Sequence, residues 1–422
     1  MLLSYYGDDF TGSADVMEAL ATRGISTVLF TRIPAETEFA PFSEYQSVGL
    51  AGASRSQTPE WMDTHLPQAF EWLKNRRARY CHYKVCSTFD SSPEIGNIGR
   101  AIEIGAGIFG QSFVPLVIGA PQLKRYTFAG HLFAGYQGRV YRIDRHPVMS
   151  RHPVTPMHES DTLLHLARQT AWPCTLANSD WPPTGIGLLD VHDAATQATA
   201  GQRLLEFAQS FVVGSSGVEY ALLQALDTRG DIEGHAGFSP LPPVDRLVAV
   251  SGSVSPTTER QINHSLSRGF EGIELDPRSL LGSERQNTIG STTARAVALL
   301  ALGKSVLVYT AKGTPTDVSQ EMAAFPDARQ RIGEGLGQIL DATISQSGVS
   351  RVVVAGGDTS STVVSQLGIH ALTTRYPLVE TPGSPLCTAH SMTTARNGLE
   401  IAMKGGQVGD NDYFCRLRDG IG

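Results

Sequence analysis

Two adjacent carboxylates near the N-terminus have types and positions that suit catalysis. Asp8 and Asp9 follow the apolar stretch LLSYYG (2–7) and precede a segment with the apolar spacing of a helix. A carboxylate between a strand and a helix can accept a proton from a substrate hydroxyl or bind Mg²⁺. The alternative is that one of them only caps the helix. Because a cap needs one carboxylate, we expect Asp9 or Asp8 to act in catalysis.

Cationic side chains are concentrated in two places. Arg55 lies in SRS (54–56), and a guanidinium can bind a substrate carboxylate through two parallel hydrogen bonds. The proline-broken segment RIDRHPVMSRHPVTPMHESD (142–161) includes Arg145 and His152. A cationic loop in an acidic protein favours an anionic substrate. The alternatives are a solvated arginine and a chance basic loop, and the histidine spacing matches no zinc pattern, so no metal site is predicted.

A third stretch, KVCSTFDSS (84–92), is rich in small hydroxyl groups. Lys84, Ser87, Thr88 and Asp90 suit a polyhydroxylated substrate, although serine and threonine are also common in plain turns. No His or Asn pattern supports Cys86 as a nucleophile, so its alternative role is that of a buried structural thiol.

Three turns rich in glycine and serine stand in the second half of the chain: SGSVSPTT (251–258), AGGDTSST (355–362) and KGGQVGDND (404–412). The first two join a strand pattern to a helix pattern, where backbone N–H groups and a helix N-terminus suit a phosphate. None is a Walker A loop or a G-x-G-x-x-G motif. Each turn alone is a common feature, but three in one half favour a site for an anion or a nucleotide.

The segments that must position these residues alternate between strand and helix patterns. Strand patterns fall at 2–7, 26–30, 47–51, 80–86, 113–118, 186–190 and 209–213, and later at 246–253, 305–311 and the start of 351–362. We therefore predict an α/β fold with two domains, each containing a mostly parallel sheet flanked by helices.

A proline-rich stretch divides the two series of strands. FSPLPPVDR (238–246) cannot continue a helix or a central strand, so we predict a linker there. The predicted domains are 1–237 and 247–422, on either side of this linker.

Composition excludes several classes of protein. Lys plus Arg number 34 and Asp plus Glu 41, and the net charge of −7 argues against nucleic-acid binding. The five cysteines form no C-x-x-C pair, which fits reduced thiols in a cytoplasmic enzyme. The N-terminus lacks the pattern of a signal peptide, and no apolar run is long enough to span a membrane.

Four motifs together resemble a known family. GDDFTGSAD (7–15), SGSVSPTTERQI (251–262), VVVAGGDTS (352–360) and MKGGQVGDNDYF (403–414) are similar, in the same order, to motifs of the four-carbon acid sugar kinases, once a domain of unknown function. The resemblance covers nearly the whole chain. Where many members carry K-x-D-S-T-L-R-G, this chain has KVCSTFDSS, with Cys86 at an acidic position.

The resemblance implies a substrate domain followed by a nucleotide-binding domain. It also implies ATP-dependent phosphorylation of the terminal hydroxyl of an acid such as threonate, erythronate or 3-oxo-tetronate. The residues predicted to contact ATP are Ser253, Ser255, Gly356, Gly357, Asp358, Thr359 and Gly406. The residues predicted to contact the acid are Arg55, Lys84, Cys86, Ser87, Thr88, Arg145 and His152.

The resulting hypothesis is an ATP- and Mg²⁺-dependent sugar-acid kinase in which Asp9 or Asp8 accepts the hydroxyl proton. Two alternatives stay open: a lyase or hydrolase that acts on a phosphorylated acid without nucleotide, and a non-catalytic sensor of the acid or nucleotide. The three turns favour the kinase. The sequence is also compatible with a homodimer.

Overall fold

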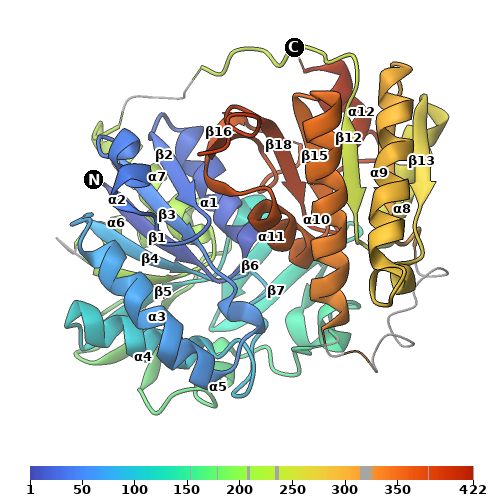
Figure 1. The fold of residues 1–422 in the computed structure, drawn as a ribbon. Coiled ribbons are helices and arrows are strands. Elements are labelled where there is room, and N and C mark those ends of the chain that lie inside the picture. The colour runs from blue at the N-terminus through green and yellow to red at the C-terminus, as the bar shows by residue number, and fades with distance from the viewer. Residues whose placement is uncertain are drawn as a thin grey trace. The chain divides into compact units, whose positions relative to one another are not determined.

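The structure is a computed structural model of the chain. It describes all residues except 153, 178, 207–209, 233–236, 314–324, 326, 379 and 422, and the side chains of Ser210 and Asp358 are also outside the description. Residue 209, the start of one predicted strand, thus lies outside the described residues. The chain divides into two compact units, Met1–Ala236 and Gly237–Gly422 (Figure 1). Each is an α/β unit with a mostly parallel sheet, which confirms the predicted fold class.

The first unit is built on a parallel sheet whose strands end at one edge. Its order is β2-β3-β1-β4-β11-β5-β10-β9. The bounds are β1 (Leu3–Gly7), β2 (Thr27–Phe30), β3 (Ser47–Ala51), β4 (Tyr80–Lys84), β5 (Phe113–Val117), β9 (Cys174–Leu176), β10 (Gly185–Leu189) and β11 (Ser210–Gly214). Gly7 pairs with both Ala51 and Lys84, and Lys84 pairs with Gly214. The loops that follow β1, β3, β4 and β11 therefore emerge side by side.

Helices cover both faces of this sheet because right-handed crossovers in opposite directions place their helices on opposite faces. One layer holds α1 (Phe10–Ala21), α6 (Ala194–Leu205) and α7 (Gly217–Arg229), and the other holds α3 (Pro59–Lys74) and α4 (Ile98–Phe109) (Figure 1). Local signals start these helices. For α3, Thr58 accepts a hydrogen bond from Trp61 N, and Pro59 occupies the first turn.

A small antiparallel sheet interrupts the βα pattern of the first unit. It consists of β6 (Arg125–Phe128), β7 (His131–Tyr136) and β8 (Arg139–Arg142). The sequence did not predict these strands. The cationic segment 142–161 begins at the last residue of β8, and its described residues include short helical turns at Ile143–Arg145 and Met149–Arg151 before α5 (Thr162–Leu166).

The second unit has the sheet order β13-β14-β12-β15-β18-β17-β16. The bounds are β12 (Val248–Ser251), β13 (Phe270–Glu274), β14 (Ser305–Tyr309), β15 (Arg351–Ala355), β16 (Ile369–Tyr376), β17 (Leu386–Ser391) and β18 (Glu400–Lys404). The pairs from β13 to β18 are parallel, whereas β17 runs antiparallel to both β16 and β18.

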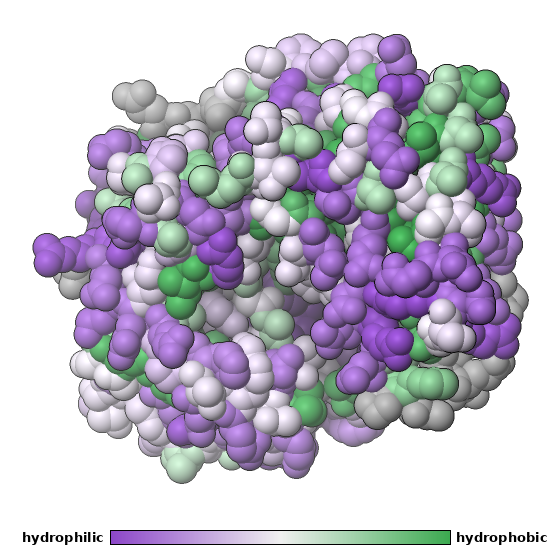
Figure 2. Space-filling view, viewed as in Figure 1, coloured by the Kyte–Doolittle hydropathy of each residue, from purple (hydrophilic) through white to green (hydrophobic). Residues whose placement is uncertain are grey.

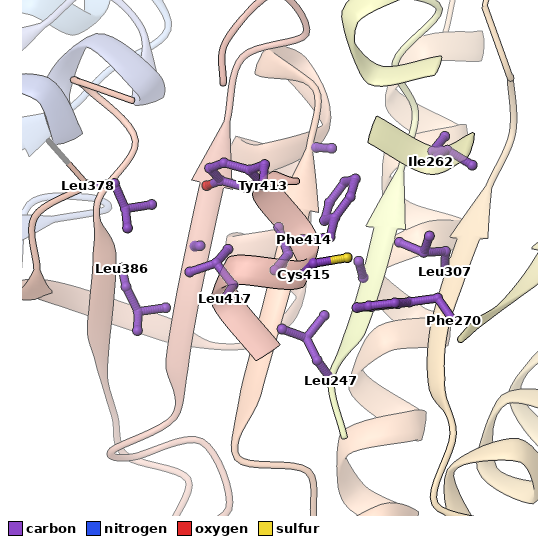
Figure 3. Close-up of a cluster of buried hydrophobic side chains, with 14 of the residues drawn as sticks. Leu247, Ile262, Phe270, Leu307, Leu378, Leu386, Tyr413, Phe414, Cys415 and Leu417 are labelled. Atoms are coloured by element: carbon purple, nitrogen blue, oxygen red, sulfur yellow. The ribbon is translucent and has the colours of Figure 1, made fainter. Parts of the chain in front are cut away.

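Helix α10 (Ala328–Ser347) packs against both α9 (Arg285–Ala301) and α11 (Gly357–Gln366), and α8 (Pro256–Ser267) packs against α12 (Tyr413–Asp419). Beneath α8 and α12 lies a cluster of buried side chains that includes Phe414 and Leu417 of α12, and Leu417 lies on the side of Leu386 (Figure 3). On the visible face of α10, mostly hydrophilic residues face outward (Figure 2). None of the helices in the described ranges is long and apolar enough to cross a membrane.

The predicted linker is held by hydrogen bonds within the second unit. Leu241 and Ile421 exchange backbone hydrogen bonds of 2.9 and 3.0 Å, and Val244 N donates to Arg418 O at 2.8 Å. The fully buried Arg351 donates to Pro242 O at 3.0 Å. The stretch 238–246 has no helix or strand, as expected, but it lies along the C-terminal helix of its own unit.

Candidate functional site

An arginine and two aspartates form an ion-paired cluster at the end of β1. Arg55 Nε and Nη2 donate to the two carboxylate oxygens of Asp8 at 3.2 and 2.8 Å, and Nη1 donates to Asp9 Oδ2 at 3.0 Å. The Arg55 backbone N also donates to Asp8 O at 3.0 Å. The structure therefore brings the three predicted residues together. Three of the five N–H donors of Arg55 are directed at aspartates, which leaves two for another ligand.

The two aspartates differ in exposure and in electrostatics. The side chain of Asp8 is 5% exposed and that of Asp9 27%. Burial raises the pKa of Asp8, while Arg55 and Lys84 act to lower it. Asp9 is the N-cap of α1, because its Oδ1 accepts a hydrogen bond of 2.8 Å from Gly12 N. One oxygen of Asp9 thus caps the helix, as the alternative proposed, and the carboxylate of Asp9 still reaches the surface.

Lys84 lies beneath this cluster, at the last position of β4. It is buried, and its Nζ donates to Val85 O at 3.1 Å. Burial also raises the pKa of Asp15, and Lys84 opposes that shift. Asp15 accepts a hydrogen bond from Ser216 at the end of β11. Lys84 therefore balances the charge of the buried carboxylates of Asp8 and Asp15. This setting differs from the direct contact with substrate that was predicted for Lys84.

Two loops that are far apart in the sequence join beside the cluster. Asp90 accepts hydrogen bonds from Thr88 Oγ1 at 2.5 Å and from Thr155 Oγ1 at 3.1 Å. Thr155 Oγ1 also lies 3.1 Å from Nδ1 of the half-buried His152. Hydrogen bonds through Asp90 thus connect the stretch 84–92 to the cationic segment 142–161.

The other predicted substrate residues lie in the same two loops. Cys86 and Ser87 are half-buried, and Arg145 is exposed. Thr88 Oγ1 lies 2.9 Å from Cys86 Sγ. Cys86 lies within electrostatic range of the guanidinium groups of Arg55 and Arg125.

Arg125, at the start of β6, is a candidate that the sequence analysis missed. Its Nη1 donates to Leu123 O at 3.0 Å and to Lys124 O at 3.2 Å. Its buried Nε has no hydrogen-bond partner among the described residues. Burial lowers the pKa of Arg125, and no carboxylate contributes to that shift. No local pattern in the sequence marks this residue, because strand β6 was not predicted.

In the second unit, three neighbouring strands end in register at the three turns. Ser251 of β12 pairs with Ala355 of β15, and Ala355 pairs with Lys404 of β18. Because all three strands are parallel, the turns 251–258, 355–362 and 404–412 leave one edge of the sheet together. This adjacency is what a composite site for one phosphate chain requires.

The turns touch one another closely. Thr258 Oγ1 lies 3.0 Å from Gly406 O and 3.1 Å from Ser253 Oγ. A Cβ on Gly406 would lie 2.7 Å from Ser253 Oγ, so this position has no room for a side chain. Gly356 has a φ of 125°, which a residue with a side chain rarely adopts, and a Cβ there would lie 2.9 Å from Thr359 Oγ1.

Two helices begin at these turns. Ser255 caps α8 through a hydrogen bond of 3.1 Å from Thr257 N, and Gly356 is the N-cap of α11, whose first residues are Gly357 and Asp358. The positive ends of both helix dipoles therefore lie at the same edge of the sheet, where they favour an anion. The side chain of Asp358 is outside the described residues.

Lys404, which the sequence analysis also missed, lies where the first and third turns meet. Its side chain is fully buried, and Nζ donates to Thr258 Oγ1 at 3.0 Å. Burial lowers the pKa of Lys404 to about 7. A lysine at a strand end gives no sequence signal of such burial, which arises from the packing of distant turns.

Comparisons with known proteins match both units. A family model described as a sugar-binding N-terminal domain matches residues 3–229, and one described as a nucleotide-binding C-terminal domain matches residues 248–414. The chain belongs to the four-carbon acid sugar kinase family. The members of this family are ATP-dependent sugar-acid kinases, and the match confirms the resemblance predicted from the motifs. The comparisons favour neither the lyase or hydrolase alternative nor the sensor alternative.

Named relatives of this kinase align over almost their full length. A 3-oxo-isoapionate kinase from Paraburkholderia graminis is 43% identical over 100% of this chain and 94% of its own. A 3-oxo-tetronate kinase from Methylobacterium radiotolerans is 27% identical over 99% of both chains, and one from Cupriavidus necator is 28% identical over 98% of this chain and 95% of its own.

Solved structures share the fold of this kinase. A Haemophilus influenzae protein matches with a TM-score of 0.73 and 23% identity over 98% of this chain and 99% of that one. A protein from Salmonella typhimurium described as a putative tRNA synthase matches with a TM-score of 0.78 and 22% identity over 99% and 98%.

Proposed function

We propose that this kinase transfers the γ-phosphoryl group of ATP to the terminal hydroxyl of a 3-oxo sugar acid, with 3-oxo-isoapionate as the first candidate. The relative of that name is 43% identical, against 27% and 28% for two 3-oxo-tetronate kinases. The replacement of the acidic position by Cys86 supports a substrate other than the four-carbon acids. The observation that carries the proposal is the Asp8–Asp9–Arg55 cluster, which presents one exposed carboxylate at the sheet edge.

Asp9 is the proposed general base. Both oxygens of Asp8 accept hydrogen bonds from Arg55, and Asp8 is buried, so Asp9 is the carboxylate that a substrate hydroxyl can approach. Asp9 accepts the proton as the hydroxyl oxygen attacks the γ-phosphorus, and Arg55 holds the carboxylate in place. Phosphoryl transfer depends mainly on positioning and electrostatics, so a single placed carboxylate suffices for the proton.

Arg125 is the proposed partner of the acid's carboxylate. Arg55 is largely engaged by Asp8 and Asp9, whereas the buried Nε of Arg125 has no partner among the described groups. A buried donor without a partner is unfavourable, and a bound carboxylate would satisfy it. Cys86, Ser87, Thr88, Arg145 and His152 would surround the rest of the substrate.

The nucleotide is proposed to bind the three turns of the second unit. Backbone N–H groups at Ser253, Ser255, Gly406 and the run Gly356–Thr359 would contact phosphate oxygens. We accordingly assign acid binding to residues 1–237 and ATP binding to residues 247–422, joined by 238–246.

We further propose that Mg²⁺ accompanies the nucleotide. The described residues contain no group of three or more His, Cys, Asp or Glu side chains that could hold a metal. Mg²⁺ usually retains several waters and binds substrate phosphates with one or two carboxylates rather than a protein cage. We propose Asp358 as its carboxylate, by its position in the turn. The ion would neutralise charge on the phosphate oxygens.

The direct test is ATP consumption with purified protein and Mg²⁺. The acids are 3-oxo-isoapionate, 3-oxo-tetronate, threonate and erythronate, with a reaction lacking acid as the control. We expect ADP to form in step with a phosphorylated acid, fastest with 3-oxo-isoapionate. Acid-independent hydrolysis alone, or turnover of an acid without ATP, would contradict the proposal. A faster reaction with a four-carbon acid would contradict only the choice of substrate.

We also propose that the kinase is a homodimer, which the sequence permits. Light scattering coupled to size-exclusion chromatography measures the mass directly. A species of one chain mass across the concentrations used in the assay would contradict this assembly.

A further inference from the structure

A buried lysine occupies the centre of the three turns. Lys404 is the last residue of β18 and has no exposed surface. Its Nζ donates to Thr258 Oγ1 at 3.0 Å, and that hydroxyl contacts Ser253 of the first turn and the Gly406 carbonyl of the third. The backbone carbonyl of Lys404 accepts a hydrogen bond of 2.9 Å from Gly356 N in the second turn. Lys404 thus contacts or adjoins all three turns.

No negative charge balances this ammonium group within the described part of the unit. No Asp or Glu among the described side chains forms an ion pair with Lys404, and burial is the cause of its lowered pKa. The charged residues on the surrounding elements have other contacts. Glu259 of α8 lies against Gly313, Arg260 of α8 donates to Thr257, and Arg351 of β15 pairs with Glu400. An isolated buried cation is strongly unfavourable, and an uncharged side chain would serve packing better.

The helices around Lys404 add to the excess of positive charge at this position. Helix α8 begins after Ser255 and α11 after Gly356, so the positive ends of two helix dipoles lie at the strand end that carries the lysine. An anion that lies between these groups relieves the repulsion among them. The arrangement is therefore suited to a ligand with several negative charges.

We propose that Lys404 is the cation that binds the phosphate chain of ATP in this kinase. The inference rests on the proposed assignment of the three turns to ATP and adds a specific ligand to it. Lys404 would donate to a β- or γ-phosphate oxygen, and the same contact would stabilise negative charge on that oxygen during transfer.

The proposal predicts that ATP binding is coupled to proton uptake by Lys404. With a pKa of about 7, Lys404 in the free protein is partly neutral at neutral pH and mostly neutral at pH 8. A bound phosphate chain raises the pKa of a neighbouring ammonium group, so ATP binding above pH 7 must take up a proton. The expected uptake is about 0.9 proton per ATP at pH 8 and about 0.1 at pH 6.

Calorimetric titration measures this uptake. A non-hydrolysable ATP analogue with Mg²⁺ is titrated at pH 6 and pH 8 in buffers of different ionisation enthalpy. The wild-type protein should take up close to one proton at pH 8. Lys404→Met should bind the analogue about 10- to 100-fold more weakly and lose the uptake. Lys404→Arg should recover part of the affinity without the uptake, because arginine stays charged.

Lys304→Met is the matched control, because Lys304 is exposed and precedes β14 at the opposite end of the parallel strands. It should bind and take up protons as the wild type does. Unchanged affinity and uptake in Lys404→Met, with normal binding by the wild type, would overturn the inference and leave the proposed function intact. A wild-type protein that binds no nucleotide at all would instead overturn the proposed function.

If Lys404→Met loses binding because it is misfolded, its circular dichroism and thermal unfolding without ligand will differ from those of the wild type. The proposal expects the opposite, since methionine removes an unbalanced buried charge. A clear fall in the unfolding temperature of the ligand-free variant would assign Lys404 a structural role and overturn the inference.

Discussion

Asp9 combines two roles that one substitution can separate. Its Oδ1 caps helix α1, and its Oδ2 accepts from Arg55 beside the proposed reaction centre. Asparagine caps a helix about as well as aspartate but cannot accept the proton. We expect Asp9→Asn to lower kcat by about 100- to 10,000-fold while the free energy of unfolding changes by roughly 1 kcal/mol or less.

Steady-state kinetics and chemical denaturation test this separation. Asp193→Asn is the control, because Asp193 caps α6 through Thr196 N away from the cluster. It should have wild-type kinetics. Full turnover in Asp9→Asn would remove Asp9 as the base and direct attention to Asp8.

Arg125 can be tested by comparing two replacements. Arg125→Met removes the charge and the Nε donor, whereas Arg125→Lys keeps the charge. We expect kcat/KM for the acid to fall by about 10- to 100-fold in Arg125→Met and less in Arg125→Lys, because hydrogen bonds to charged groups contribute about 1.5–3 kcal/mol. The KM for ATP should not change.

The exposed Arg139 of β8 supplies a control on the same small sheet, and Arg139→Met should leave both constants unchanged. An equal loss for the acid and for an uncharged ester of it would argue against recognition of the carboxylate by Arg125.

The three parallel strands β12, β15 and β18 position the nucleotide turns, and Gly406 marks how closely those turns approach. A Cβ at this position would lie 2.7 Å from Ser253 Oγ and 3.2 Å from Ser255 Cβ. Gly406→Ala should displace the first turn at a cost of about 1–3 kcal/mol. We expect the KM for ATP to rise by about tenfold, while the KM for the acid stays near its wild-type value.

The matched control is Gly290→Ala in helix α9, where nothing lies within 4 Å of the added Cβ. That change should stabilise the protein by about 0.5–1 kcal/mol. Equal effects of the two substitutions on the KM for ATP would show that the Gly406 contact is not specific.

Much of this arrangement is readable from local sequence, and the exceptions have a common physical cause. The apolar runs of β1, β3, β4 and β15 are buried parallel strands, which is the pattern most easily recognised. Strands β6, β7 and β8 were missed because their burial is mixed: Arg139 and Val140 in β8 are exposed, so no clear alternation marks them. The antiparallel β16 and β17 were likewise not predicted.

The candidate site shows the same division between local and long-range information. The turns and aspartates carry local signals because glycine, serine and strand-end carboxylates are unusual in those positions. Arg125 and Lys404 carry none, since a basic residue at a strand end is normally solvated. Only the packing of distant segments buries Lys404 and the Nε of Arg125, and neither cation has a carboxylate partner among the described side chains.

The stability of the whole protein should depend on pH in a way that Lys404 controls. Its folded-state pKa of about 7 lies below the unfolded value of about 10.4, so between these values the unfolded chain holds a proton that the folded protein lacks. Stability from this group therefore rises with pH. The destabilisation is about 5 kcal/mol below pH 7 and disappears toward pH 10.

Denaturant unfolding of the ligand-free protein at pH 7, 8 and 9 checks this sign. Relative to wild type, Lys404→Met should be most stabilising at pH 7, and the difference should shrink at each step. A difference that stays constant or grows with pH would contradict the assignment.

The hydrogen bonds of Asp90 carry a consequence for how substrate preference can change over evolution. Asp90 accepts from Thr88 in one loop and from Thr155 in the other, so these loops form one structural unit although they are encoded far apart. Substitutions in only one of the two loops would leave a buried polar group without its hydrogen-bond partner. New acid preferences should therefore arise through paired changes, and a chimera that exchanges both loops should inherit the donor's preference where single-loop exchanges fail to fold well.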